Sequence, residues 1–222
     1  FLPVSSSGHL VIGQALLDVV IPGVLFEVAV HVATLVSILL VYRTRVGGLL
    51  RGAATGDRDA LGYIGLVVVA TVPAGLLGVF AEDAVERLFD NPWAPGVALL
   101  VTGAFLWSSR AAQHRASAER PTWVGALLIG VAQAFALVPG ISRSGATVVA
   151  ALWLGIEARE AAAFSFLMAV PAIGGAAVLQ LPDLLEGSTA ALTPSVVLAG
   201  GVVAGVTGVL AIRTFNAMLA RR

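Results

Sequence analysis

Long apolar runs separated by short polar stretches dominate the chain. A helix of about 20 apolar residues is long enough to cross the roughly 30 Å hydrocarbon core of a bilayer. The pattern predicts membrane-spanning helices at residues 23–42, 61–80, 94–109, 161–180 and 195–219. We therefore expect an all-α fold, a polytopic membrane helix bundle in which residues 1–222 form a single integral membrane domain.

The composition supports this interpretation. Of the 222 residues 58% are hydrophobic and only 12% are charged, with a mean hydropathy of +0.95, whereas a soluble domain carries about 25% charged residues. The membrane is therefore an expected partner, and we expect no nucleic-acid partner. The absence of Cys excludes disulfides and thiolate chemistry.

All 13 basic residues are Arg, and their positions predict the orientation in the membrane. Arg-rich connections face the cytoplasm, which places residues 43–60, residues 110–121 and the C-terminus there. The acidic stretches at residues 81–93 and 181–194 then lie outside.

The spans alternate correctly only if residues 122–156 enter and leave the membrane on the cytoplasmic side. The apolar run at residues 146–156 is too short to cross a bilayer, which argues against two full spans. We therefore predict a re-entrant helix–loop–helix hairpin there. The same logic predicts a second hairpin near residues 1–20, entering from the opposite face.

The tips of these two hairpins resemble each other. Residues 2–8 (LPVSSSG) align with residues 138–145 (VPGISRSG) after one inserted Gly. Three full spans lie between them, so the second copy is inverted relative to the first. Inverted repeats with broken helices bind ligands near the membrane midplane, and we predict repeats at about residues 1–109 and 122–219.

Arg143 is the most informative residue of the second tip. A charge at membrane depth costs at least about 3 kcal/mol and normally faces a cavity or a partner. Its guanidinium suits phosphate oxygens, and a helix starting near Ser144 would direct free N–H groups to the same place. An Arg that reaches an interface or pairs with a structural carboxylate is the alternative. Ser142 and Thr147 beside it favour an anion site.

The first tip offers the hydroxyls of Ser5, Ser6 and Ser7 and the imidazole of His9. A lone His is more often a hydrogen-bonded core residue than a catalyst. Opposite an Arg-containing loop it can act as a nucleophile or a general acid. Phosphoryl transfer depends mostly on positioning and electrostatics, which such a pair of loops would supply.

Two sequence motifs, at residues 1–9 and 139–147, resemble the signature motifs of the undecaprenyl pyrophosphate phosphatases of the bacitracin-resistance type. Residues 130–133 and 159–166 agree with the same family. The resemblance implies hydrolysis of a polyprenyl diphosphate lipid to the monophosphate, which recycles the lipid carrier for cell-wall synthesis. It also implies a place in the plasma (inner) membrane, with the active site open to the outer face.

The resemblance assigns Ser6 and His9 as catalytic residues and Ser142, Arg143 and Thr147 as pyrophosphate-binding residues. The composition of the two loops adds their neighbours as candidates. His9, Ser6 and Arg143 are the expected catalytic residues. Substrate binding is expected of Ser5, Ser7, Ser142, Ser144, Gly145 and Thr147.

The family further implies a divalent cation, Mg or Ca, bound by two glutamates before the first motif. By spacing they would precede Phe1, so we assign the cation to no residue. We see no signal peptide and expect some N-terminal residues to be missing from this sequence. Glu27 and His31 share a helix face, and a structural pair is the preferred interpretation of them.

Two other functions remain open. Inverted repeats are also typical of transporters, so a flippase of an anionic lipid is the alternative, and a non-catalytic lipid-binding scaffold is a third. Gly201 and Gly205 in the last span suit close helix contact, either within the protein or in a homodimer.

Overall fold

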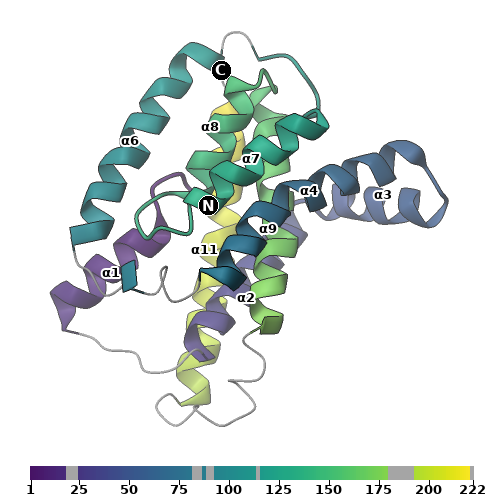
Figure 1. Cartoon of the computed structure of the whole chain (residues 1–222). Coiled ribbons are helices and arrows are strands. Elements are labelled where there is room, and N and C mark those ends of the chain that lie inside the picture. The colour runs from purple at the N-terminus through teal and green to yellow at the C-terminus, as the bar shows by residue number, and fades with distance from the viewer. Residues whose placement is uncertain (19–24, 82–86, 89–92, 114–115, 180–192, 221–222) are drawn as a thin grey trace.

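The computed structural model describes residues 1–18, 25–81, 87–88, 93–113, 116–179 and 193–220, and this part of the chain is helical (Figure 1). The helices are α1 (Ser6–Leu17), α2 (Leu25–Val41), α3 (Arg43–Ala54), α4 (Arg58–Phe80), α6 (Trp93–Gln113), α7 (Trp123–Phe135), α8 (Arg143–Trp153), α9 (Ala158–Leu179) and α11 (Pro194–Ala220). Across these ranges the only β-type pairing is an isolated bridge between Ala118 and Ile156. The all-α prediction is confirmed.

The predicted spans correspond to helices. Among the described residues, α4, α9 and α11 are each long and apolar enough to cross a membrane, and α2 joins α3 in a pair bent by 80° that passes the same test. The predicted span at 94–109 lies within α6. In Figure 1, α2, α9 and α11 form the centre of the bundle, and α6 stands to one side with α1 below it.

The interpretation of residues 43–60 as a polar loop is wrong, because residues 43–54 form helix α3. Arg, Leu and Ala are strong helix formers, and they make up seven of the 12 residues of this segment. Gly56 has φ +76 and reverses the chain, and the Asp57 carboxylate then accepts from the N–H of Asp59 to cap α4. Figure 1 shows α3 and the start of α4 projecting together from the bundle.

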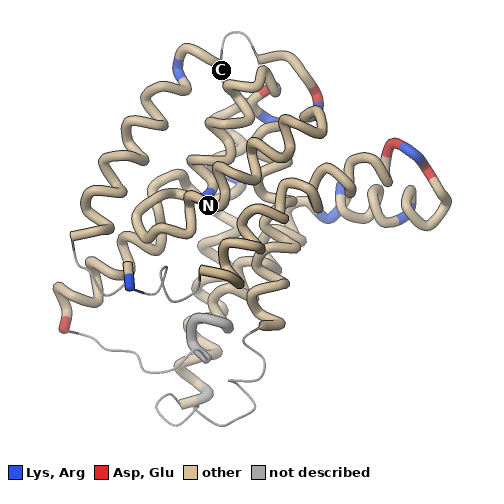
Figure 2. Tube along the Cα trace, in the orientation of Figure 1, with Lys and Arg blue, Asp and Glu red and all other residues tan. Residues whose placement is uncertain are grey.

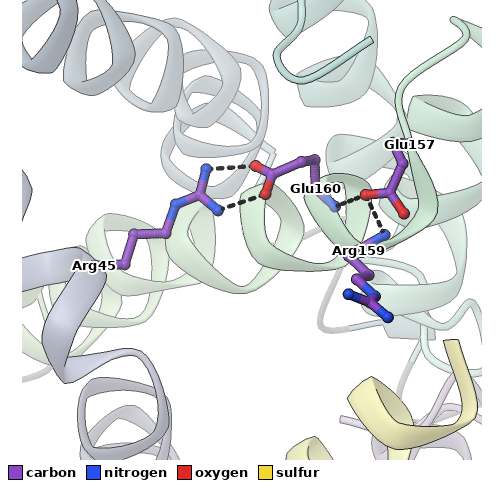
Figure 3. Close-up of polar contacts among 4 residues, drawn as sticks. All are labelled: Arg45, Glu157, Arg159 and Glu160. Atoms are coloured by element: carbon purple, nitrogen blue, oxygen red, sulfur yellow. Dashed lines mark hydrogen bonds and ion pairs between the residues drawn. The ribbon is translucent and has the colours of Figure 1, made fainter. Parts of the chain in front are cut away.

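Ionic contacts join this projecting pair to the bundle (Figure 3). The Arg45 guanidinium of α3 donates to both carboxylate oxygens of Glu160 on α9, at 2.9 and 2.5 Å. The Glu157 carboxylate accepts from the N–H groups of Arg159 and Glu160 and so caps α9. The bidentate pair therefore fixes α3 against the first turn of α9.

Charged residues lie at the helix ends and on the turn between α3 and α4, while the bodies of the helices are nearly free of them (Figure 2). That distribution suits helices surrounded by hydrocarbon. The acidic stretches predicted to face outside, residues 81–93 and 181–194, lie largely outside the described residues. The side chain of Glu27 does too, so its pairing with His31 stays a prediction.

The predicted hairpin is present as α7 and α8, which have 13 and 11 residues. Each is too short to cross a bilayer alone. The segment before α7 is bonded to the end of α8: Ala118 N–H donates to Gly155 O, and Glu157 N–H donates to Ala118 O, both at 2.9 Å. The chain therefore enters and leaves this hairpin on one side, as predicted.

The core lies where α9 contacts α2, α4 and α8. Residues 161–169 of α9 are buried without interruption, and Phe166 contacts the rings of Tyr42 and Phe215. Helices also approach closely through glycine. A Cβ on Gly130 of α7 would lie 2.4 Å from the carbonyl oxygen of Ala70 on α4.

The small-residue face of α11 is partly internal. Ser37 Oγ of α2 donates to the carbonyl oxygen of Gly205 at 2.9 Å, and a Cβ on Gly208 would lie 2.7 Å from that same Oγ. Gly201 has open space around it. Gly205 and Gly208 therefore serve packing within the protein.

Candidate active site

Two loops begin their helices in the same way. The first loop (residues 1–5) ends at Ser5, whose Oγ accepts from the N–H of Gly8 at 3.3 Å at the start of α1. The second loop (residues 136–142) ends at Ser142, whose Oγ accepts from the N–H of Gly145 at 3.1 Å at the start of α8. In each loop the serine two positions later lies 3.3 or 3.4 Å from the capping oxygen. The aligned motifs thus form the same local structure.

The two loops are in contact. A Cβ on Gly8 would lie 2.8 Å from Cα of Gly140, and a Cβ on Gly145 would lie 3.4 Å from Cβ of Pro3. Gly140 also has φ +99, which favours glycine. The predicted convergence of the two tips is therefore observed, and at Gly8 and Gly140 the backbones meet with no room for a side chain.

Thr102 of α6 holds the second loop in place. Its hydroxyl donates to the carbonyl oxygen of Gly140 at 2.9 Å and accepts from the N–H of Ser142 at 3.0 Å. Thr102 was not among the residues predicted from the sequence. The only available signal was one hydroxyl within an apolar span, and such a hydroxyl more often bonds to its own helix.

Arg143 is the first residue of α8 and is half-buried. Its guanidinium has neither a hydrogen-bond acceptor nor an ion-pair partner among the described residues. The backbone N–H groups of Arg143 and Ser144 also have no acceptor there, as is usual in the first turn of a helix. An unpaired guanidinium beside free N–H groups forms a site that an anion would complete.

The hydroxyl of Thr147 faces the protein instead. Its Oγ1 donates to the carbonyl oxygen of Arg143 at 2.8 Å and lies 2.6 Å from Oγ of Ser165 on α9. The side chain is 0% exposed, so in this geometry it supports the start of α8 and fixes that turn against α9. Ser5, Ser142 and Ser144 are likewise buried, and two of these three hydroxyls are occupied as caps.

His9 and Ser6 are exposed at the start of α1. His9 Nδ1 lies 2.8 Å from the carbonyl oxygen of Ser5. Because a carbonyl only accepts, the proton of the neutral ring is placed on Nδ1, and Nε2 keeps its lone pair. The ring is thus held by its own helix turn with a basic nitrogen available.

The described site residues do not fit a divalent cation by themselves. Mg²⁺ and Ca²⁺ prefer carboxylate and carbonyl oxygens, while the two loops offer hydroxyls, an imidazole and a guanidinium. Within the described ranges, no group of three or more His, Asp or Glu side chains comes together.

Gln133, in the last turn of α7, is a further candidate polar group. It is 2% exposed, and neither its Oε1 nor its Nε2 has a partner in the described part of the chain. Leaving such a group unsatisfied costs about 1–3 kcal/mol. The sequence analysis used Gln133 only as part of a motif, since burial is invisible in the sequence.

Fold and site together define an integral membrane protein whose broken helices meet at a candidate anion site. Residues 1–222 match the family described as "Bacitracin resistance protein BacA", and the chain belongs to this family. It is 41% identical to the undecaprenyl-diphosphatase of Rubrobacter xylanophilus, covering 100% of this chain and 85% of that protein. It is 37% identical to the undecaprenyl-diphosphatase of Desulfatibacillum aliphaticivorans, covering 99% and 85%. The resemblance inferred from the two motifs is confirmed.

Thr102→Val removes both bonds of that hydroxyl and leaves Gly140 O and Ser142 N–H buried and unsatisfied. Each such loss costs about 1–3 kcal/mol, and each kcal/mol lowers the melting temperature of a protein of this size by about 2–4 °C. We expect a lower melting temperature in detergent. Thr207→Val is the matched control, because the Thr207 hydroxyl bonds only to its own helix. Equal melting temperatures for the two variants would contradict the role of Thr102.

Proposed function

We propose that this protein is a membrane phosphatase that hydrolyses undecaprenyl diphosphate to undecaprenyl phosphate and inorganic phosphate. The observation that carries the proposal is Arg143 at the start of α8, whose guanidinium has no partner in the described part of the chain. It follows a loop that contacts the loop before Ser6 and His9. The names of the relatives favour a phosphatase over the transporter alternative.

The diphosphate binds at the N-terminus of α8. The guanidinium of Arg143 and the free N–H groups beside it bind the phosphate oxygens and stabilise their charge in the transition state. The same groups favour the leaving monophosphate, because they neutralise charge on the bridging oxygen.

The nucleophile comes from the first loop. Either Nε2 of His9 attacks the terminal phosphorus, or it takes the proton of Ser6 Oγ while that oxygen attacks. In both cases the bond from phosphorus to the bridging oxygen breaks and undecaprenyl phosphate leaves. Water then releases inorganic phosphate from the enzyme.

The proposed location is the plasma (inner) membrane, with the site open to the outer face. The arginines of residues 43–60 and 110–121 support this orientation, because both segments belong on the cytoplasmic side. The product there is the lipid carrier that cell-wall synthesis consumes.

A divalent cation stays part of the proposal through the family resemblance alone. It needs carboxylates beyond the described site residues. Treating the purified enzyme with EDTA should abolish phosphate release, and Mg²⁺ or Ca²⁺ should restore it. Unchanged release in EDTA would remove the cation from the proposal.

A homodimer through α11 is also proposed. Gly201 lies in open space on this helix, and its outer face exposes Leu198, Val202 and Val206. Small residues beside such a face suit helix association in lipid. Cross-linking in native membranes should give a dimer, and monomer alone would exclude it.

Arg143→Ala should lower phosphate release from undecaprenyl diphosphate by about 10²–10³-fold, the usual cost of losing one transition-state donor. His9→Ala should also inactivate the enzyme. Arg110→Ala is the control: the Arg110 guanidinium lies over the Trp107 ring, 4.1 Å from its centroid, and this variant should keep the parent rate.

Phosphate release measured on the purified enzyme distinguishes the phosphatase from the transporter. Parent-like turnover by Arg143→Ala would contradict the assigned site. Movement of the lipid across liposomes without phosphate release would instead favour the transporter.

A further inference from the structure

A groove runs between α6, α7 and α8 beside the second loop. Its volume is about 400 Å³. The wall is apolar except for Thr102 and Ser142, and its other residues include Val101, Phe105, Leu128, Phe135, Ala150 and Trp153.

One end of the groove belongs to the candidate active site. Ser142 caps the helix that begins with Arg143, and Thr102 bonds to that same serine. A group bound at the start of α8 therefore lies next to the groove, and anything attached to it can continue between the helices.

The other end carries two stacked aromatic rings. The ring of Phe105 lies 5.7 Å from that of Trp153, with 23° between their planes. Trp153 is the last residue of α8, whose 11 residues span roughly 15 Å at 1.5 Å per residue.

We propose that this groove holds the first isoprene units of the substrate, with the Phe105–Trp153 pair contacting the chain where it leaves the protein. This inference rests on the proposed function. An unsaturated hydrocarbon ester-linked to a diphosphate needs an anion site that continues into an apolar channel, and these helices provide both. Trp153 is 55% exposed and Phe135 66% exposed, so the groove opens sideways to lipid and the substrate can enter from the membrane.

The direction of the groove agrees with a lipid of the outer leaflet. The end of α8 lies next to Ser117 and Ala118, and in the proposed orientation the Arg-containing segment 110–121 is cytoplasmic. The head group at Arg143 is thus nearer the outer face than the tail, which is how an outer-leaflet lipid is oriented.

The size of the groove limits how many isoprene units of the substrate the protein can contact. A pocket of 400 Å³ is at the small end of ligand sites, so it encloses only a few isoprene units. The remainder of an undecaprenyl chain lies in the bilayer, where added length brings no further contact with the protein.

The test compares dimethylallyl, farnesyl and undecaprenyl diphosphates in detergent. Ala150→Trp fills the groove two turns from Ser142, about 12 Å along the helix. We expect its KM to rise by about tenfold for farnesyl and undecaprenyl diphosphate alike, with little change in kcat, as for the loss of uniform binding. Turnover of dimethylallyl diphosphate should not change, because one isoprene unit does not reach this position.

Ala104→Trp is the matched control, since Ala104 is exposed on α6 and outside the groove wall, and all three KM values should stay at the parent level. Trp153→Ala, at an exposed position, is the second variant and should raise the two long-chain KM values without altering that for dimethylallyl diphosphate.

Two outcomes would overturn the inference while leaving the phosphatase intact. In the first, both groove variants have the parent's KM for farnesyl and undecaprenyl diphosphate. The groove then holds only an acyl chain of a membrane lipid. In the other, both variants affect the three substrates equally. A parent enzyme that releases phosphate from none of the three would instead refute the proposed function.

Discussion

Arg143, an arginine with no counterion among the described residues, constrains the rest of this structure. Its charge costs at least about 3 kcal/mol at membrane depth, and its position adds to the cost, because a helix N-terminus already carries about half a positive charge. Helix α1 also starts at the contact between the loops, and neither α1 nor α8 has an acidic residue in its first turn. Positive potential from two helix ends and one guanidinium is thus concentrated at one place. In the proposed binding mode a diphosphate relieves this repulsion, so that the cost in the unliganded protein becomes affinity for the substrate.

Such a site persists only if its loops cannot relax. Non-helical backbone is tolerated in a membrane where protein satisfies its polar groups. Thr102 does so for Gly140 and Ser142, and the two serine caps do so for the helix starts. Glycine at positions 8 and 140 lets the loops touch. The short helices of the re-entrant hairpin are joined, at the end away from the loop, by backbone bonds between Ala118 and the residues just after α8. These contacts hold the two loops in place, and with them the start of α8 at Arg143.

The length of apolar runs and the distribution of arginines were enough to predict the spans and the re-entrant hairpin, because both follow from the thickness of the bilayer and the cost of charge within it. Helix α3 was missed since an Arg-rich segment is equally compatible with a loop. Thr102 was missed for a different reason: its partners are about 40 residues away, and a hydroxyl in an apolar helix carries no sign of them. Thr147 was predicted, but its role was not. A motif identifies a hydroxyl but not the direction in which that hydroxyl points.

Some side chains of the two hydroxyl-rich motifs stabilise the structure, and others remain available to a ligand. Ser5 and Ser142 are occupied as caps, so the groups left for a ligand are the guanidinium of Arg143, Nε2 of His9 and the exposed Ser6. Ser142 has a second role, because it also lines the apolar groove. The proposed positions of head group and tail therefore share this one residue. Phosphoryl transfer is sensitive to the alignment of nucleophile and leaving group, and a displacement of about 1 Å can cost about a hundredfold in rate. In the proposed binding mode the two loops set that alignment, while the groove adds binding that is equal in the ground state and the transition state.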